Sequence, residues 1–509
     1  MIPDCALRLV PTRQPVRASY LLPFFTALIA MILSAPLDLH ADVRVSRKEN
    51  KERVIIQEYR FRVTPAKTTR PAFQYRLTVP PHQTIPGNAI THYLRSDGEG
   101  SLRRPIDYAR ETYGDVIFKW ASLETPTDDI KLDDLRAVSS SFESFVQQHL
   151  RRATFCRDSD WGLALEDLSG KETYEFLLPS VQQTRTMARI LQMRNRLAVI
   201  EGRHEDSVEH LRMTYQLAHR VGDLGLLVSG LVAISETSMA NQGMMHLISS
   251  KNGPNMYWAL SELPQPVIDL RSAFQLEAGM ALRYFDELDG IESDQLTNAE
   301  WKAKLNRTIV QWVELYEMIG YRSSEPMKKL TPAITVGMAL VSYPQAKQRL
   351  IESGLDAETV ETMPVPKVIL LDAKRELTAY SDEVNKAYCL PFQQYQTVDS
   401  EVQEELRASA TKNLGAAMAN LILPASQQVR RAQARTQAEV NALIIVESIR
   451  NHYAMTGSVP KTLDELKLPT RENPLTGKPF GYTVNNNEAV IDFEVGVPYR
   501  SKYVIEFID

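Results

Sequence analysis

Histidines with nearby carboxylates are the first side chains to check for chemistry, because two histidines on one helical face and a third ligand make a zinc site. The chain has nine histidines, and His204, Glu205 and His210 come nearest to such a pattern. Residues six apart point to different sides of a helix, whereas zinc hydrolases use a spacing of four. We therefore expect no metal site, and we interpret this segment as a solvated helix N-terminus.

Other signatures of catalysis are missing as well. The sequence has no Gly-x-Ser-x-Gly turn for a nucleophile and no glycine-rich phosphate loop ahead of a helix. The acidic pairs at 128–129 and 133–134 lack the spacing of a calcium loop, so we interpret them as charges at a helix start. No cofactor and no catalytic residue is predicted. A triad built from distant segments would leave no such pattern, so the question of enzyme activity stays open.

The composition is that of an ordinary folded protein, and we expect its partner to be a protein. The chain has 509 residues, a length that suggests two to four domains, and 44% of them are hydrophobic. Lys and Arg number 58 against 63 Asp and Glu, for a net charge of −5. Proteins that bind nucleic acid usually carry a basic excess, so we expect no nucleic-acid partner.

An apolar run at residues 20–35 predicts export. Arg8, Arg13 and Arg17 precede the run, which gives the order of charges and apolar residues found in a signal peptide. We predict a signal over residues 1–41 and a location in the periplasm or cell envelope. The alternative is an uncleaved segment that anchors the protein in the membrane, which would be its only membrane contact.

Removal of this leader takes away Cys5 and leaves Cys156 and Cys389. In an oxidising compartment these two residues could form one disulfide. Two buried free thiols are the alternative, and the sequence does not decide between them. A single bridge does not make a disulfide scaffold, so the fold must depend on its hydrophobic core.

Four residues are candidates for ligand or partner binding. Asn88 follows Pro86-Gly87 in a predicted turn, where its amide is available to a ligand. Asn255, Tyr257 and Trp258 follow a Gly-Pro break, and an exposed aromatic pair there would form a partner groove. The alternatives are a structural turn for Asn88 and an aromatic core plug for the other three.

The periodicity of apolar residues divides the mature chain into three regions. Residues 42–125 are predicted to be β-rich or irregular, because apolar residues alternate at two places. These are Phe73, Tyr75, Leu77 and Val79, and Val54, Ile56, Tyr59, Phe61 and Val63, the second with a phase slip that a bulge would absorb.

Residues 126–424 have helical periodicity. Two helices are predicted within 181–221, separated by Glu201-Gly202-Arg203, and together they form a hairpin similar to a tetratricopeptide pair. No 34-residue period repeats elsewhere, so we predict an irregular array of helical hairpins. Further helices are expected at 224–250, 266–290, 296–320, 328–354, 365–395 and 400–421.

Residues 425–509 are predicted to form a long helix followed by a small antiparallel sheet. A hairpin is expected at 482–493 and a further strand near 504–507. The overall prediction is an α+β fold that is mainly α: a β-rich N-terminal region, a helical-hairpin array and a C-terminal helix-plus-sheet module.

The C-terminal segment resembles the soluble domain of type II secretion pseudopilins. The resemblance rests on Ala442-Leu443, Ile449-Arg450, Tyr453, Gly457-Ser-Val-Pro460, Leu463-Asp-Glu-Leu466, Asn473-Pro474, Gly477-Lys478-Pro479-Phe480 and Tyr482. Pseudopilins carry a prepilin peptidase motif and an apolar helix directly ahead of this domain, whereas residues 42–424 intervene here. The resemblance therefore implies the shape of the domain and not its assembly into a pilus.

The mature chain also resembles an uncharacterised family of large exported proteins of planctomycete type. The matching residues include Pro71-Ala-Phe73, Asp160-Trp161-Gly162, Arg185-x-x-Ala188-Arg189, Pro254-Asn255-Met-Tyr257-Trp258, Asp269-x-Arg271 and Met363-Pro364-Val365. This resemblance implies the architecture and the exported context, and it supplies no catalytic residue. We expect an exported, non-enzymatic interaction or scaffold protein. The alternatives are a component of a secretion or pilus-like assembly and a hydrolase of envelope polymers.

Overall fold

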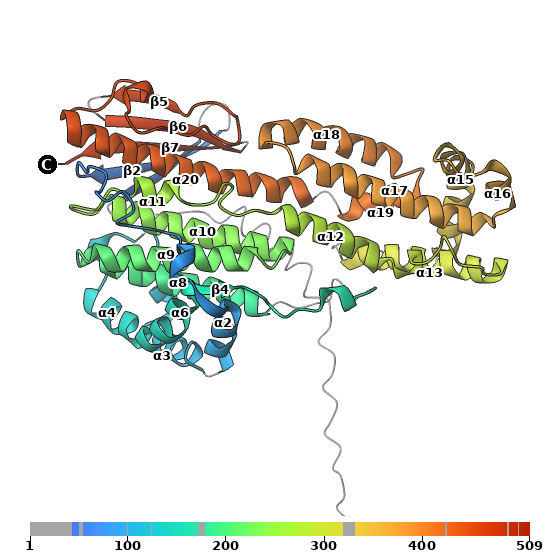
Figure 1. The fold of residues 1–509 in the computed structure, drawn as a ribbon, viewed down its shortest axis with the longest axis horizontal. Helices are drawn as coiled ribbons and strands as arrows, with labels where there is room; N and C mark the ends of the chain where they lie inside the picture. Colours follow the sequence, from blue (N-terminus) through green and yellow to red (C-terminus); the bar gives the residue numbers. More distant parts are fainter. Residues whose placement is uncertain are drawn as a thin grey trace, which may run out of the picture.

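The computed structural model describes residues 43–49, 54–98, 100–123, 125–170, 172, 179–318, 331–422, 425–485, 488–496 and 498–508. The expected signal over 1–41 lies outside these residues. Helices make up 62% of the structure and strands 11%, which confirms the α+β class with a majority of helix. The molecule is elongated, with a layered body at one end and a helical arm that extends from it (Figure 1).

The outer layer of the body is a five-stranded sheet with the order β1-β2-β7-β6-β5. Its strands are β1 (Val43–Glu49), β2 (Ile55–Val63), β5 (Gly481–Asn485), β6 (Glu488–Gly496) and β7 (Tyr499–Phe507). β2 runs parallel to β7, and the other neighbours are antiparallel. The predicted C-terminal hairpin and third strand are therefore present. The strands predicted near the N-terminus are present as β1 and β2, and they complete the C-terminal sheet.

β2 pairs with β7 without interruption from Ile55 to Val63, so the expected bulge is absent. Tyr59, Phe61 and Val63 face the core, and the ring of Tyr503 on β7 lies 5.3 Å from that of Tyr59. Aromatic pairs of this kind stabilise neighbouring strands beyond the area that they bury. The N-terminal strand thus shares its core with the C-terminal one.

The strand expected at 73–79 does not form. Phe73 is 45% exposed whereas Leu77 is fully buried, and the backbone between them bends. The carbonyl oxygens of Arg76 and Leu77 accept hydrogen bonds from the side chains of Arg212 and Gln216. This segment packs against the helix that carries Arg212 and Gln216 and pairs with no described strand. Alternation of apolar residues alone therefore did not predict its structure.

Helices α2 (Ala89–Gly98), α3 (Arg103–Tyr113) and η3 (Gly114–Phe118) follow the short strand β3 (Ile85–Asn88), in a region that was predicted to be β-rich or irregular. The next elements lie in the region predicted to be helical: α4 (Leu132–Ser141), α5 (Glu143–Phe145), α6 (Arg151–Phe155) and β4 (Cys156–Asp158). β3 and β4 form a small parallel pair. α3 buries only Ile106 and Ala109, and so few apolar positions give a weak periodic signal.

Three long helices form the middle of the body: α8 (Pro179–Ile200), α9 (His204–Gly222) and α10 (Leu227–Ile248). α8 and α9 are the predicted hairpin, and Gly202 between them has a φ of +71°, which a glycine adopts without strain. Short α11 (Tyr257–Ser261) and long α20 (Ala425–Thr456) lie between this layer and the sheet (Figure 1). No helix in the described ranges is long and apolar enough to cross a membrane.

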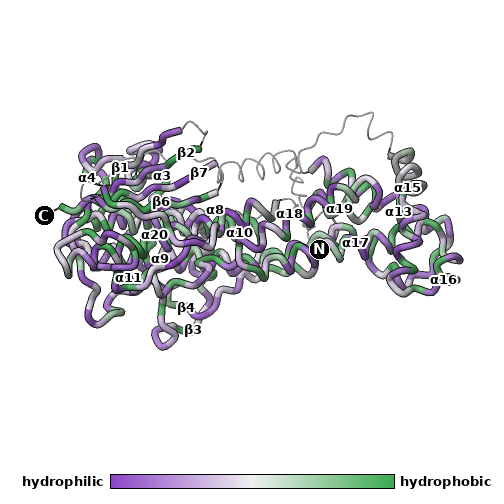
Figure 2. The backbone as a smooth tube through the Cα atoms, turned by 90° about the horizontal axis from the view of Figure 1, so that it is seen from above, coloured by the Kyte–Doolittle hydropathy of each residue, from purple (hydrophilic) through white to green (hydrophobic). Residues whose placement is uncertain are grey.

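The arm consists of α12 (Arg271–Tyr284), α13 (Asn298–Met318), α15 (Thr331–Glu352), α16 (Ala357–Thr362), α17 (Val365–Ala387), α18 (Phe392–Ser409) and α19 (Leu414–Ile422). The single helix expected at 365–395 is wrong at its end, because Pro391 separates α17 from α18. A bidentate pair between Arg349 and buried Asp372 joins α15 to α17. Figure 2 shows hydrophilic and hydrophobic segments alternating along the arm as along the body, as expected for amphipathic helices.

A buried ion pair on α20 joins three parts of the chain. Glu447 and Arg450 are both fully buried, with 2.9 Å between Nη1 and Oε2. Arg450 also donates to the carbonyl oxygens of Thr64, after β2, and Gly253, after α10. Nearly every donor of the guanidinium is satisfied in this way, which offsets the cost of burying the charge.

Removing one partner of this pair is predicted to destabilise the body strongly. Glu447→Gln leaves the Arg450 charge buried without its carboxylate, and we expect the free energy of unfolding to fall by about 3–5 kcal/mol. Urea denaturation followed by circular dichroism measures the loss.

The matched control is Glu383→Gln, which removes an exposed i, i+3 pair with Lys386 on α17. Exposed pairs contribute about 0–1 kcal/mol, so this variant should unfold almost like the parent protein. Equal losses in the two variants would contradict the role assigned to the buried pair.

Candidate functional site

Asn255 and Tyr257, two of the residues predicted to bind a partner, have structural partners instead. The amide of Asn255 donates to the carbonyl oxygens of Ala66 and Glu447, at 2.9 Å each. The hydroxyl of Tyr257 donates to the carbonyl oxygen of Pro469 at 2.6 Å. Both side chains are buried, so the core-plug alternative describes them.

The other two predicted binding residues are nearer the surface and do not share a site: Trp258 packs against Tyr257, whereas Asn88 contacts Ile90 and Asp160. Trp258 is half-buried, with its ring 5.0 Å from that of Tyr257 in an edge-to-face contact. Asn88 accepts a hydrogen bond from the backbone of Ile90 at the start of α2 and donates to the carbonyl oxygen of Asp160. Its amide is therefore occupied in holding a turn.

Cys156 and Cys389 are free thiols in the structure, so the disulfide alternative is not formed. Cys156 is buried, and its thiol lies 3.4 Å from the carbonyl oxygen of Arg152. Cys389 is exposed, which differs from the expectation of two buried thiols.

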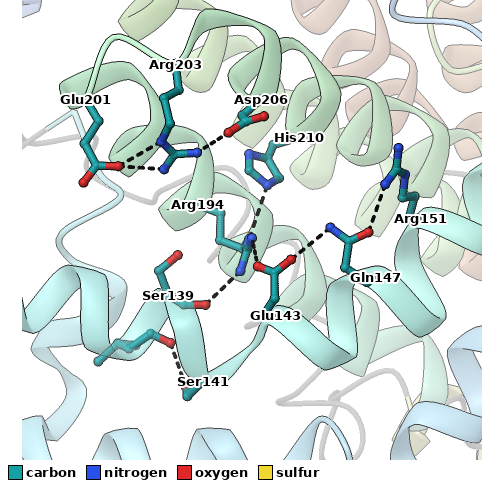
Figure 3. Close-up of polar contacts among 11 residues, drawn as sticks. Ser139, Ser141, Glu143, Gln147, Arg151, Arg194, Glu201, Arg203, Asp206 and His210 are labelled. Atoms are coloured by element: carbon teal, nitrogen blue, oxygen red, sulfur yellow. Dashed lines mark hydrogen bonds and ion pairs between the residues drawn. The ribbon is translucent and has the colours of Figure 1, made fainter.

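The histidines that the sequence brings near a zinc pattern belong to hydrogen-bond networks. His210 is buried, not solvated, and accepts a hydrogen bond from Nε of Arg194, as Figure 3 shows. Arg194 also donates to the carbonyl oxygen of Ser139 and pairs with Glu143. Burial, together with the charges of Arg194 and Arg203, lowers the pKa of His210 to about 3, so the ring is neutral and can accept this hydrogen bond. These hydrogen bonds join α8 and α9 to the segment from α4 to α5.

His204, at the start of α9, shares a hydrogen bond of 3.2 Å with the hydroxyl of Ser250. No group of three His, Cys, Asp or Glu side chains in the described part of the chain is arranged to hold a metal ion. These two histidines are therefore explained by their structural contacts.

A groove lies where the arm meets the C-terminal module. It has a volume of about 470 Å³. Its walls come from α18, the loop before β5, and strands β6 and β7: Gln393, Gln396, Asn473, Leu475, Thr476, Lys478, Pro479, Phe480, Gly481, Asp492, Phe493, Glu494 and Arg500. The groove thus joins two regions that are separate in the sequence.

The loop wall is held rigidly by its own hydrogen bonds. Buried Asn473 donates from its amide to the carbonyl oxygen of Glu494 at 3.1 Å and pairs through its backbone with Lys478. Gly477 has a φ of +62°, and a methyl group at this position would collide with the side chain of Gln393. Glycine is therefore required where the loop meets α18.

The surface of the groove is mainly polar and charged, and two aromatic rings are buried beneath it. Phe480 and Phe493 are these rings, with centroids 5.1 Å apart. Arg500 donates to Asp492 at 2.8 Å and lies 3.5 Å from Glu494, so the strand side carries one net negative charge. Charged side chains of this kind favour a partner with complementary charges.

Two arginines of α20 set the distance between the groove walls. Arg430 donates to the carbonyl oxygen of Leu390 just before α18, and Arg435 donates to the carbonyl oxygen of Val495 on β6. Arg430 also lies over the ring of Tyr395 on α18, 5.7 Å from its centroid. α20 therefore fixes both the arm and the sheet.

The loop residues Asn473 and Gly477–Phe480 belong to the pseudopilin resemblance, but no binding site was predicted there. The opposite wall, with Gln393 and Gln396, carries no motif. Only the fold brings α18 to this loop, so a single sequence could not show the groove.

No family model matches the chain, and neither a curated protein nor a solved structure matches it significantly. The two resemblances given above therefore stay predictions.

Away from the groove, Glu236 on α10 is a buried carboxylate that has no hydrogen-bond partner within 3.5 Å among the described residues. Burial raises its pKa from 4.5 to about 8, although Thr184 and Arg185 lie close enough to oppose the shift. Between pH 4.5 and about pH 8, the carboxyl is protonated in the folded protein but ionised in the unfolded chain. This residue therefore lowers the free energy of unfolding as pH rises through that range.

Replacement of Glu236 by glutamine is predicted to remove that pH dependence. The slope contributed by one such group is about 1.4 kcal/mol per pH unit between the two pKa values. We expect the variant to gain stability over the parent protein from pH 5 to pH 8, with no further gain above pH 8. Urea denaturation at pH 5, 7 and 9 measures the difference, and parallel stability curves for the two proteins would refute the prediction.

Proposed function

We propose that the protein is a non-enzymatic binding scaffold that holds a protein partner in the groove between α18 and the C-terminal module. The observation that supports this most is the open groove itself, which is lined by polar and charged side chains over two buried aromatic rings. The predicted binding residues elsewhere are occupied by structural contacts, as described above.

The neighbouring edge of the sheet supports an extended partner segment. β5 is at the edge of the sheet and, among the described strands, pairs only with β6. Gly481, Thr483 and Val484 are exposed, and Gly481 also lines the groove. An exposed edge strand offers unpaired backbone groups to an added strand, while pockets beside it recognise side chains.

The charges on the rim indicate what such a segment would carry. Asp492 and Glu494 outnumber Arg500 on the strand side, whereas Lys478 on the loop side is exposed and has no side-chain ion pair among the described residues. A partner segment with a basic residue toward the strands and an acidic residue toward the loop matches this arrangement. Since the N-terminal sequence predicts export, the partner is an envelope protein in this proposal.

Site-specific crosslinking tests the groove. A photo-crosslinking amino acid at Gln396, which lines the groove, should capture one protein partner from the native envelope. The same amino acid at Gln394, which is exposed on the same helix but outside the groove, should not. Mass spectrometry of the crosslinked product identifies the partner, and equal capture from both positions would contradict the proposal.

Charge reversal in the groove is predicted to weaken the capture. Lys478→Glu, tested with the crosslinker at 396, should lower the yield at least about threefold, because a rim charge of the wrong sign disfavours a complementary partner. Lys412→Glu is the matched control, since Lys412 is also exposed but lies outside the groove. The same yield from both variants would show that Lys478 does not face the partner.

A further inference from the structure

Arg185 and Arg189 on α8 are half-buried and form no ion pair within 4.0 Å with another described residue. Arg185 and Arg189 lie one helical turn apart, and neither makes a side-chain hydrogen bond or ion pair with another described residue. Nε of Arg185 is fully buried with no acceptor. Like charges at i, i+4 destabilise a helix, and a buried donor without a partner costs more. The position needs an explanation beyond folding.

The surroundings add positive charge. Arg110 on α3 and Arg189 both lie over the ring of Phe118, at 5.5 and 5.8 Å from its centroid. Burial lowers the pKa of Arg189, and its two neighbouring arginines lower it further. The carboxylate of Asp115, 3.5 Å from Arg110, is 87% exposed and therefore well screened.

Glu236 does not neutralise this cluster. It faces Arg185 from α10, but the two groups form no ion pair within 4.0 Å, and its carboxyl is largely protonated at neutral pH because its pKa is raised to about 8. In the described part of the chain, no carboxylate therefore lies within 4.0 Å of Arg185 or Arg189, and both arginines are partly buried.

We propose that Arg185 and Arg189, with Arg110 and Phe118 beside them, form a binding site for a phosphate group. Guanidinium groups bind phosphate oxygens through paired, charge-assisted hydrogen bonds. A dianion balances two of the three arginine charges, whereas a single carboxylate balances only one. The phosphate would also accept hydrogen bonds from the guanidinium nitrogens that now lack acceptors.

The spacing of the arginines fits this role. Ala188, between them, is fully buried, so the helix turns its small residue to the core and both arginines to one side of it. Positions that break a local stability rule without a structural gain are often functional sites. The site is independent of the groove, since neither arginine lines it.

Titration of the full-length protein with inorganic phosphate tests the proposal. Chloride is exchanged for phosphate at constant ionic strength, and binding is followed by isothermal titration calorimetry and by the thermal unfolding temperature. We expect saturable binding with one phosphate per chain. Arg189→Gln should weaken it about tenfold or more, because a hydrogen bond to a charged group is lost with the charge.

Three further variants keep the test interpretable. Arg189→Lys retains the charge but not the paired geometry, and it should weaken binding less than Arg189→Gln does. Arg185→Gln should weaken binding as Arg189→Gln does. Arg407→Gln removes an exposed arginine on α18 and should leave phosphate binding unchanged.

Without phosphate, Arg189→Gln should raise the unfolding temperature, since it removes an uncompensated charge.

Two results would overturn the proposal. One is the same thermal shift for chloride and phosphate at equal ionic strength. The other is equal phosphate affinity in the parent protein and the Arg189→Gln variant. Tighter binding of phenyl phosphate than of inorganic phosphate would assign the site to a phosphate ester, and equal or weaker binding would assign it to the free ion.

Discussion

The buried pair of Glu447 and Arg450 is the contact on which the body depends. It brings α20, the residues after β2 and the loop after α10 to one point, where charge and backbone carbonyl groups satisfy each other. A buried pair of this kind contributes little to stability when compared with an apolar packing, but it strongly disfavours arrangements that leave one charge alone. Its main effect is therefore to specify which segments meet.

The groove follows from the same helix. α20 extends from this pair to the arm, and its arginines donate to backbone carbonyl groups before α18 and on β6. The arm and the sheet, which lie side by side above α20 (Figure 1), are thereby held in place. Residues of both line the groove. A scaffold can bind with a rigid surface in this way without reactive groups, because less ordering entropy is lost when the partner docks.

Periodicity predicted the long elements well and the short ones poorly. The α8–α9 hairpin, α20 and the β5–β6 hairpin carry enough apolar positions to determine their type. Residues 73–79 alternate like a strand but bind the side chains of α9, and α2 and α3 bury too few residues to give a clear period. The predicted binding residues agree with the structure less well than the predicted helices and strands do. Whether Asn255 and Tyr257 bind a partner or fill the core could not be decided from the sequence, because their partners, Glu447 and Pro469, lie about two hundred residues away.

The central claim is that the N-terminal strand belongs to the C-terminal sheet. Hydrogen exchange read by mass spectrometry tests it directly, by comparing peptides that cover β2 (Ile55–Val63) and β7 (Tyr499–Phe507). The account predicts that both strands are strongly protected and lose protection together as urea is added, because each satisfies the other's backbone groups. Fast exchange in β2 with β7 still protected would contradict it.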